Sequence, residues 1–420
     1  MAMMKKPVTG MKDILPAEMQ IRDYLIGLIK ETYRGFGFTP IETPCVESIE
    51  NLCSKQGGEN EKLIFKILKR GEKLHMETAE TENDLVDTGL RYDLTLPLVR
   101  YYSNNAASLP SPFKALQIGS VWRADRPQKG RFRQFTQCDI DILGEPSNLA
   151  EIELILATTT CLGKIGFSDF TVRINDRRIL KAMASYSGFA GEDYDKVFII
   201  LDKMDKIGMD GVAAELAEEG FPEAAINKYT ELFRELETAE NGFNYLGEKL
   251  AGFLEQEVVD HMNMIRDTVL AAASSSFRLV FDPTLVRGMS YYTGTIFEIG
   301  MEGFSGSVAG GGRYDEMVGK FTGQKTCACG FSIGFERIVT ILLDRGYTVP
   351  GAADKQAILL EKGLPADKVC SVMKEASQLR AAGKQVLVAT KNKNVKFQKE
   401  QLAKDGYLDV RVVYKEEFQN

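Results

Sequence analysis

The stretch FKALQIGSVWRADRPQKGRFRQFTQCDIDILG, residues 113–144, restricts the folds open to this chain more than any other segment. Closely spaced apolar residues and a final Val-Trp pair predict a strand over Phe113–Arg123. The polar segment Ala124–Gly130 contains a Pro and a Gly and predicts a loop. A second strand is predicted over Phe132–Leu143. The stretch therefore predicts a β-hairpin with a long loop on two rigid strands, a position where loops commonly carry function.

The loop of this hairpin is strongly basic, and its second strand is polar on one face. Five cationic side chains lie close together in the sequence: Arg123, Arg126, Lys129, Arg131 and Arg133. Most such charge runs are solvated surface. Here, however, Gln137, Asp139 and Asp141 alternate along the second strand, so their side chains share one face. Guanidinium groups above carboxylates suit a ligand with a polyphosphate end and a cationic end, so we interpret the strand as a pocket floor.

Composition narrows the possible classes of protein. The 420 residues are enough for two or three domains, and 44% hydrophobic and 26% charged residues are ordinary for a globular chain. No apolar run is long enough to span a bilayer, and no apolar signal core follows the N-terminal lysines, so we expect a cytoplasmic protein without a membrane segment. The seven cysteines lack paired spacing, which fits reduced thiols in that compartment.

The sequence offers little material for a zinc site or a Ser-His-Asp triad. It has only two histidines, His75 and His261, and Cys327 and Cys329 are too close for the usual zinc spacing. The net charge of −7 disfavours nonspecific nucleic-acid binding by the whole surface but is compatible with local basic patches.

The segments before the hairpin predict one long helix and several short extended pieces. Pro16 is expected to begin a helix with one apolar stripe, which ends at Gly35. Phe38–Val46 contains two prolines and predicts an edge or interface strand. A short strand is expected at Leu63–Leu68 and an exposed excursion at Glu77–Asp87.

Two interpretations are open for the segment GLRYDLTLPLVR, residues 89–100. If the segment is extended, Asp93 and Thr95 lie on one face and could hold an ammonium group by charge-assisted hydrogen bonds. An Asp and a Thr before an apolar run also commonly cap a helix. The spacing alone favours neither.

After the hairpin the pattern changes twice. A helix is predicted over Leu149–Leu162 and a strand over Phe170–Ile174. From 177 to 273 the pattern is helical throughout and rich in Glu, which indicates an inserted helical domain. Strands return at Phe277. A Gly- and Pro-containing linker is expected at Asp344–Asp354.

The C-terminal part alternates strand and helix, which predicts an α/β unit with a largely parallel sheet. Its expected elements are Gln356–Leu360, Ala366–Ala381, Gln385–Ala389, Val395–Lys404 and Val410–Tyr414. Its second helix region is basic because it carries Lys391, Lys393, Lys396, Lys399 and Lys404. Such a helix is either a solvated surface or an RNA-facing patch.

Three further segments are weak signals when each is taken alone. Arg287-Gly before a Tyr pair predicts a tight turn that leads into a strand. The glycine run in Ser307–Asp315 supplies backbone that can approach a ligand closely. Gly330–Val339 predicts a strand followed by a helix that carries Arg337, and an Arg at a helix start is usually only solvated.

Together these motifs resemble those of a known family. The loop sequence from Arg123 to Phe135 resembles motif 2 of class II aminoacyl-tRNA synthetases in its histidyl form. Residues 287–294 resemble RGLDYYTG, the motif peculiar to histidyl-tRNA synthetases, but here Met289 and Ser290 replace Leu and Asp. The Ser removes a negative charge close to Arg287, which bears on the orientation of that guanidinium.

Two more segments extend the resemblance. Residues 330–339 resemble motif 3. The helix that begins at Pro16 and the strand through Pro44 resemble motif 1, which forms a homodimer interface in the family. The resemblance therefore covers nearly the whole chain, and the motifs occur in the family's order.

The resemblance implies an α+β fold. Its parts would be a class II antiparallel sheet flanked by helices, a helical insertion, and a shortened C-terminal α/β domain similar to anticodon-binding domains. The expected boundaries are 1–176 for the first part of the catalytic core, with motifs 1 and 2; 177–273 for the insertion; 274–343 for the second part of the core; 344–354 for the linker; and 355–420 for the C-terminal domain. In the family the insertion meets the tRNA acceptor arm.

The implied activity is that of a histidine–tRNA ligase acting as a homodimer on tRNA(His). The carboxylate of histidine would attack the α-phosphorus of ATP, giving histidyl-adenylate and pyrophosphate. A terminal ribose hydroxyl of the tRNA would then take the histidyl group. No enzyme nucleophile is needed, and Mg²⁺ would accompany the ATP phosphates without protein side chains assigned as ligands.

The resemblance also implies roles for individual residues. Catalytic arginines would be Arg123 and Arg287 at the α-phosphate and Arg337 at the γ-phosphate. ATP would be bound by Arg123, Asp125, Arg131, Phe135 and Arg337, with Phe135 stacked on adenine. Histidine would be bound by Asp93, Thr95, Gln137, Asp141, Arg287, Tyr291, Tyr292 and Tyr314. The first three of these would hold the amino end, and Asp141 and Tyr292 the imidazole. The tRNA acceptor end would meet Arg126, Gln128 and Lys129.

An alternative is a non-catalytic paralogue that binds histidine and regulates an ATP phosphoribosyltransferase. Such paralogues typically lose motif residues and the C-terminal domain. Arg123, Arg287 and Arg337 are all present in this chain, which favours the ligase. Ser290 and the short tail point the other way.

Overall fold

The structure is a computed structural model that describes residues 5–53, 60–288, 292–304, 306–351 and 354–415. The chain divides into two compact units. The first unit comprises Met1–Asp13 and Leu25–Asp344, and the second comprises Ile14–Tyr24 and Arg345–Asn420. The finer domain boundaries expected from the sequence stay a prediction.

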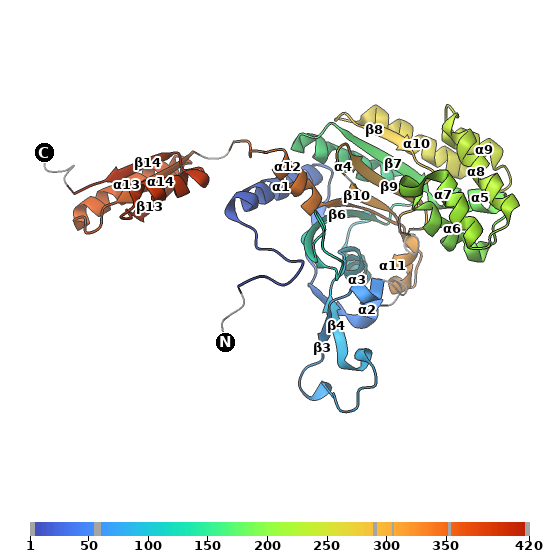
Figure 1. Ribbon diagram of the computed structural model, residues 1–420, viewed down its shortest axis with the longest axis horizontal. Coiled ribbons are helices and arrows are strands. Elements are labelled where there is room, and N and C mark those ends of the chain that lie inside the picture. Colours follow the sequence, from blue (N-terminus) through green and yellow to red (C-terminus); the bar gives the residue numbers. More distant parts are fainter. Residues whose placement is uncertain (1–4, 54–59, 289–291, 305, 352–353, 416–420) are drawn as a thin grey trace. The chain divides into compact units, whose positions relative to one another are not determined.

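An eight-stranded sheet forms the centre of the first unit (Figure 1). In sheet order its strands are β1 (Thr39–Pro40), β5 (Phe113–Trp122), β6 (Gln134–Leu143), β11 (Ala328–Gly334), β10 (Ser307–Arg313), β9 (Thr295–Met301), β7 (Phe170–Asp176) and β8 (Arg278–Phe281). All neighbours are antiparallel except β1 with β5 and β7 with β8. The predicted α+β class with a large antiparallel sheet is therefore confirmed.

The predicted hairpin is β5 and β6, which lie between the edge strand β1 and β11. The two strands pair from Phe113 with Leu143 to Trp122 with Gln134. On β6 the apolar side chains of Cys138, Ile140 and Ile142 are fully buried. The polar side chains alternate with them and so lie on the opposite face of the sheet.

Helices cover the sheet. Those outside the helical segment are α1 (Pro16–Gly35), α2 (Ile49–Cys53), α3 (Thr95–Asn105), α4 (Leu149–Ile165), α11 (Asp315–Thr322) and α12 (Phe335–Asp344). Helix α1 begins at the predicted proline, and the chain beyond it turns through Gly37, whose positive φ of 82° favours glycine. Helix α4 packs on β6 and β11, and α12 on β6 and β10.

Residues 177–273 are helical, as predicted. They form α5 (Arg177–Ser187), α6 (Tyr194–Leu201), α7 (Met204–Glu218), α8 (Glu223–Glu237), α9 (Gly242–Lys249) and α10 (Gln256–Ala272). These helices gather beside β7 and β8 in Figure 1 and share an aromatic core in which Tyr229 meets Phe189 and Phe233 edge to face. The strand order places the segment at one end of the sheet because it connects β7 to β8.

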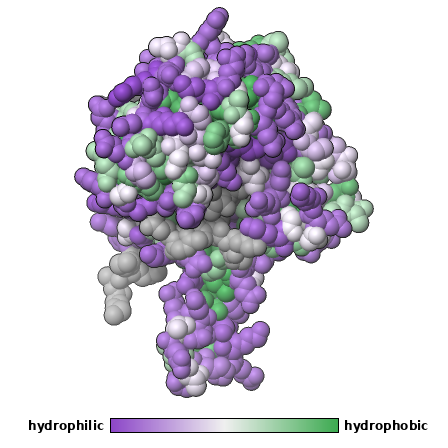
Figure 2. All heavy atoms as spheres, turned by 90° about the vertical axis from the view of Figure 1, so that its right-hand side faces the viewer, coloured by the Kyte–Doolittle hydropathy of each residue, from purple (hydrophilic) through white to green (hydrophobic). Residues whose placement is uncertain are grey.

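Short strands precede α3, as predicted, and most of them lie outside the large sheet. Strand β1 is the sheet's edge, and β2 (Val46–Ser48), β4 (Val86–Leu90) and β3 (Lys66–Leu68) form a separate small sheet. The excursion between β3 and β4 is exposed over Glu80–Asp84, as expected from its charges. Figure 2 shows it as a mostly hydrophilic projection below the rest of the unit.

The second unit contains the predicted parallel α/β fold. Its sheet order is β13 (Gln385–Thr390), β12 (Lys355–Leu360) and β14 (Asp409–Val413), with helices α13 (Ala366–Ala381) and α14 (Val395–Lys404). Its core is formed by Ile358, Val372, Ala376, Val386 and Val413. Over the described parts of both units, no helix is long and apolar enough to cross a membrane.

The close antiparallel pairing of β10 with β11 gives a prediction about stability. A Cβ at Gly311 would lie 2.0 Å from the carbonyl oxygen of Gly330, so Gly311→Ala must displace backbone. We expect this change to lower the free energy of unfolding by about 2–3 kcal/mol, measured by denaturant titration. Gly300→Ala in the neighbouring strand β9 is the control, because nothing lies within 4 Å of a Cβ there. Equal effects of the two changes would contradict this account.

Candidate active site

A cavity of about 1130 Å³ opens on the polar face of β6 in the first unit. It brings together twelve of the residues predicted to bind ligands: Asp93, Thr95, Arg123, Asp125, Arg131, Phe135, Gln137, Asp141, Arg287, Tyr292, Tyr314 and Arg337. The three loop residues assigned to tRNA, namely Arg126, Gln128 and Lys129, are not among its lining residues. Tyr291, Met289 and Ser290 lie outside the described residues.

The floor of the cavity is built by β6 and β11 in register. Gln137, Asp139 and Asp141 stand opposite Gly334, Ser332 and Gly330 of β11. Side chains opposite each other on antiparallel strands share a face, so the small residues of β11 leave the polar groups of β6 accessible. At Gly330 a Cβ would lie 2.0 Å from Asp141 Oδ1. The glycine is therefore required by the carboxylate opposite it.

Asp141 is a buried carboxyl with spare hydrogen-bonding capacity. The hydroxyl of Tyr314 donates to its Oδ1 at 2.6 Å, while Oδ2 is buried without a hydrogen-bond partner. Burial raises the pKa of Asp141 to about 7; the Tyr314 bond opposes this, and the charge of Asp93 adds to it. The unused oxygen could accept a hydrogen bond from an N–H group of a ligand.

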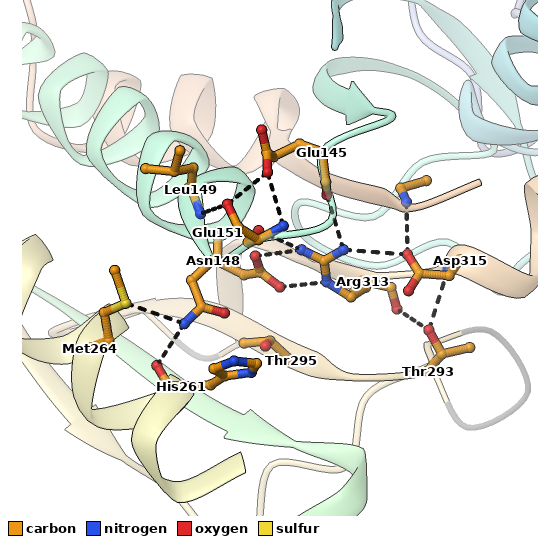
Figure 3. Close-up of polar contacts among 12 residues, drawn as sticks. Glu145, Asn148, Leu149, Glu151, His261, Met264, Thr293, Thr295, Arg313 and Asp315 are labelled. Carbon is orange, nitrogen blue, oxygen red and sulfur yellow. Dashed lines mark hydrogen bonds and ion pairs between the residues drawn. The ribbon is translucent and has the colours of Figure 1, made fainter. Parts of the chain in front are cut away.

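Both chain neighbours of Tyr314, Arg313 and Asp315, belong to a polar network (Figure 3). The preceding residue, Arg313, forms a bidentate ion pair with the fully buried Glu151 at 2.7 Å. Burial lowers the pKa of Arg313, but the bonds to Glu151 outweigh that effect and raise it. The following residue, Asp315, accepts from the backbone N–H of Ala328 at 2.7 Å. Both neighbours thus anchor the backbone that carries the Tyr314 hydroxyl.

The same network reaches Tyr292 on the other side of the pocket. Thr293, the next residue, donates its backbone N–H to the Arg313 carbonyl at 2.8 Å. Its hydroxyl accepts from the backbone N–H of Asp315 at 3.3 Å. Tyr292 and Tyr314, both predicted to bind histidine, therefore belong to backbone segments that are joined directly.

The two interpretations of Asp93 and Thr95 are resolved in favour of the helix cap. Thr95 is the first residue of α3, and Asp93 Oδ1 accepts from the backbone N–H of Leu96 at 3.1 Å. The segment is helical from Thr95 and not extended, and Thr95 and the four residues after it are all buried. Both side chains nevertheless line the cavity, so capping and ligand contact are compatible.

Guanidinium groups gather at the other end of the cavity. Arg287 pairs with Glu298 and donates to the Ser307 hydroxyl, and Arg337 donates to the Ser307 carbonyl. Burial lowers the pKa of Arg287 and of Arg337. Neighbouring guanidiniums lower both further, Arg337 acting on Arg287 and Arg131 with Arg123 acting on Arg337. This mutual repulsion would be relieved by a polyanion.

Aromatic rings flank the cationic end. The guanidinium of Arg123 lies 4.1 Å from the ring centre of Tyr92 and 5.2 Å from that of Phe135. Its Nε donates to the Tyr92 carbonyl at 3.0 Å. Arg131 is paired with Asp125 at 3.1 Å. The planar groups form a surface on which a flat heterocycle can stack next to the positive charges.

The glycine run of β10 packs against protein atoms. A Cβ at Gly312 would lie 2.5 Å from the Thr295 carbonyl, and one at Gly310 would lie 3.0 Å from Arg287 Nη1. The sequence had suggested close approach to a ligand as the reason for these glycines. In the structure, Gly310 is itself a lining residue of the cavity and also makes room for Arg287.

Other lining residues had no assigned role in the sequence analysis. Ser307 lies in the glycine-run segment and Ser332 and Glu336 lie in the segment that resembles motif 3, but none of the three was assigned a role. Helices α5 and α6 add Arg177, Lys181, Asp195 and Ile199 to the lining, and only the fold brings those helices to this cavity. Asp139 was noticed through the alternation on β6 and is a lining residue too.

The chain was compared with known protein families and with curated relatives. The family model described as histidyl-tRNA synthetase matches residues 10–338. A histidine–tRNA ligase of Leifsonia xyli subsp. xyli is 42% identical over 418 residues, which cover 96% of this chain and 95% of that protein. A probable histidine–tRNA ligase of Tropheryma whipplei is 43% identical over 345 residues, 80% of each chain.

Solved structures agree on the fold. A histidyl-tRNA synthetase from Nostoc sp. PCC 7120 superposes with a TM-score of 0.77 at 27% identity and covers 96% of this chain and 90% of its own. A structure from Bacillus halodurans C, titled as an ATP phosphoribosyltransferase regulatory subunit/histidyl-tRNA synthetase, also gives 0.77 but at 20% identity, covering 98% of this chain and 99% of its own. At that identity the second likeness shows a shared fold only, so it does not support the regulatory alternative.

The burial of Asp141 predicts how stability depends on pH. Its pKa is about 7 in the folded chain against 3.8 for the ordinary group, so folding favours the protonated carboxyl. Its contribution is complete below about pH 4 and is lost as the pH rises through 7, at most about 4 kcal/mol. Asp141→Asn should therefore flatten the pH dependence of the unfolding free energy between pH 4 and 8. The exposed Glu192→Gln is the control, and an unchanged slope in Asp141→Asn would refute the assignment.

Proposed function

The chain belongs to the histidyl-tRNA synthetases, a family of class II aminoacyl-tRNA synthetases, and on that premise we propose which of its residues carry out each part of the reaction. The enzyme is a histidine–tRNA ligase, which joins histidine to tRNA at the expense of ATP. One observation supports the residue assignments most directly. A single cavity holds a guanidinium cluster at one end and buried carboxyl and amide groups at the other.

Histidine binds at the carboxyl end of the cavity in this proposal. Asp141, with its unpaired Oδ2, and Tyr292 meet the imidazole, while Tyr314 fixes the carboxyl through Oδ1. An apolar isostere would leave these buried polar atoms without partners, which gives discrimination against it. Asp93, Thr95 and Gln137 surround the ammonium group, for which the unpaired Gln137 Oε1 is an available acceptor.

ATP binds at the guanidinium end. Arg123 and Arg287 contact the α-phosphate, Arg337 the γ-phosphate, and Phe135 stacks on adenine beside Arg123. Asp125 orients Arg131 through their ion pair, so that Arg131 adds to the positive end. The histidine carboxylate attacks the α-phosphorus and pyrophosphate leaves. The reaction is accelerated by positioning of the substrates and by neutralisation of charge on the pentacovalent α-phosphate, without a protein nucleophile.

Mg²⁺ is expected with ATP. Among the described residues no group of three His, Cys, Asp or Glu side chains could hold a metal ion. The phosphate oxygens of ATP would be ligands of the ion.

The second step requires the 3′ end of tRNA(His) to reach the adenylate. A terminal ribose hydroxyl attacks the histidyl carbonyl and AMP leaves. The loop between β5 and β6 carries Arg126, Gln128 and Lys129 beside the cavity, and Lys129 pairs with Asp344 at an exposed position. Replacing Asp344 by an RNA phosphate as the partner of Lys129 would cost little free energy, because surface ion pairs are weak.

The second unit offers a further RNA-facing surface. On α14, Lys396, Lys399 and Lys404 are exposed, as is Lys393 just before the helix, and Phe397 on the helix is 54% exposed. Cationic side chains beside an exposed ring suit phosphates and an unstacked base. We assign this face to the anticodon region of the tRNA.

A cytoplasmic homodimer fits these features. All seven cysteines are free, as expected in a reducing compartment. Strand β1 is an edge of the large sheet and belongs to the segment that resembles motif 1. An edge strand presents unpaired backbone groups, which a second copy could cover.

Arg287→Ala should greatly slow the formation of the adenylate. A guanidinium contact made in the transition state is worth roughly 3–4 kcal/mol in such a site, so histidine-dependent exchange of pyrophosphate into ATP should fall several hundredfold. Histidine and ATP binding should stay within a few-fold. Glu298 keeps its ion pair with Arg173, so the fold should survive. The exposed Arg234→Ala is the control, and near-normal exchange in Arg287→Ala would remove this residue from the mechanism.

Ending the chain after Asp344 tests the second unit. Every proposed site residue for histidine and ATP lies upstream, so pyrophosphate exchange should be retained. Transfer to tRNA should suffer through KM, and the salt dependence of tRNA binding should weaken by about one unit of slope per lost phosphate contact. The substitution Lys396→Glu in the full chain should act in the same direction. Full tRNA charging with an unchanged salt slope would show that the acceptor end alone carries recognition.

A further inference from the structure

Asp139 is a buried carboxyl that neither reaction step uses. It is 3% exposed, lies on β6 between Gln137 and Asp141, and stands opposite Ser332 on β11. Burial raises its pKa, and the negative charge of Asp141 raises it further. Burying such a group lowers the stability of the fold unless hydrogen bonds or opposite charges compensate for the lost water.

The contacts of Asp139 lead to a single neighbour. The Ser332 hydroxyl donates to Asp139 Oδ1. Gln137 Nε2 donates to Ser332 Oγ at 3.1 Å and is 3.5 Å from Asp139 Oδ2. The Ser332 hydroxyl uses its one hydrogen in the bond to Asp139, so toward Gln137 it can only accept. The hydroxyl therefore requires the amide of Gln137 to turn its NH₂ toward it.

This arrangement determines what Gln137 presents to the cavity. Its Oε1 is buried without a hydrogen-bond partner. The positions opposite Gln137 on the two neighbouring strands are Gly119 and Gly334, which contribute no side chain there. The orientation of the amide thus depends on Ser332 and Asp139.

We propose that Asp139 is a positioning residue for histidine: through Ser332 it holds the Gln137 amide with Oε1 facing the cavity, where it accepts a hydrogen bond from the substrate's ammonium group. This rests on the proposed contact between Gln137 and the amino end of histidine. A reversed amide would direct its NH₂ at the ammonium, and two donors repel. The amide orientation therefore contributes to the recognition of a free amino group.

The charges around Asp139 work with the substrate. Asp93 and Asp141 oppose ionisation of Asp139, and Arg123 favours it. A bound ammonium adds positive charge, so it favours the carboxylate form that fixes the amide. Substrate binding and amide orientation then reinforce each other.

The test compares two ligands that differ only in the amino group. Binding of histidine and of 3-(imidazol-4-yl)propionate, which lacks the amine, is measured by calorimetry for the full chain and for Asp139→Asn. The asparagine side chain tolerates either amide orientation, so histidine should bind about tenfold more weakly, the loss of one charge-assisted bond, while the amine-free analogue binds within twofold of normal. Ser332→Ala should act in the same direction. The exposed Asp267→Asn is the matched control.

A double-mutant cycle separates positioning from direct contact. If Asp139 acts through Gln137, then Asp139→Asn should add nothing in a Gln137→Ala background, and the KM for ATP should stay within twofold in every variant. Additive losses would overturn the proposal, because Asp139 would then contact the ammonium itself. An equal loss for both ligands would overturn it too, because it would indicate general damage to the pocket.

The variants also distinguish the role of Asp139 from the proposed contact between Gln137 and the amino group of histidine, on which it rests. If Gln137→Ala leaves histidine binding unchanged, the assignment of Gln137 to the amino end fails, and the role of Asp139 fails with it. If Gln137→Ala weakens histidine binding but Asp139→Asn and Ser332→Ala do not, only the role of Asp139 fails.

Discussion

The pairing of β6 with β11 is the constraint on which the site depends. Polar residues of β6 face Gly330, Ser332 and Gly334, the last of these opposite Gln137. Larger residues on β11 would fill the space above the polar groups, and at Gly330 even a methyl group would meet Asp141. The register is equally critical, because a slip of one residue would turn Ile140 toward the ligand and the carboxylates toward the apolar face of the sheet. The cavity is therefore a consequence of strand pairing.

Charge is separated along this floor. The guanidiniums of Arg287 and Arg337 share Ser307. Burial lowers the pKa of both; Arg337 lowers that of Arg287 further, and Arg131 and Arg123 lower that of Arg337. At the other end burial keeps the pKa of Asp139 and Asp141 high. Without a ligand of opposite charge, the charged form of the side chains is unfavourable at both ends. A substrate pair that brings phosphates to one end and an ammonium group to the other relieves both costs at once.

The pocket keeps its shape through contacts outside the cavity. The buried ion pair of Arg313 with Glu151 anchors the end of β10 to helix α4, and Tyr314 follows directly on the chain. Removing one partner of such a pair leaves an uncompensated buried charge, so the pair resists change. The Thr293 bonds carry this rigidity to Tyr292. A small shift in the ring positions would cost selectivity for the imidazole.

The sequence by itself determined the elements and the chemistry of the motifs. Periodicity gave the hairpin, the helical segment 177–273 and the parallel C-terminal sheet, because a strand or helix that buries one face must repeat its apolar residues with its own period. Alternation also placed Gln137, Asp139 and Asp141 on one face. Only the tertiary structure decided that Asp93 caps a helix, that Gly310 makes room for Arg287, and that Ser332 lies opposite Asp139. Those facts depend on strand register and on contacts between segments distant in the chain, and no local pattern records them.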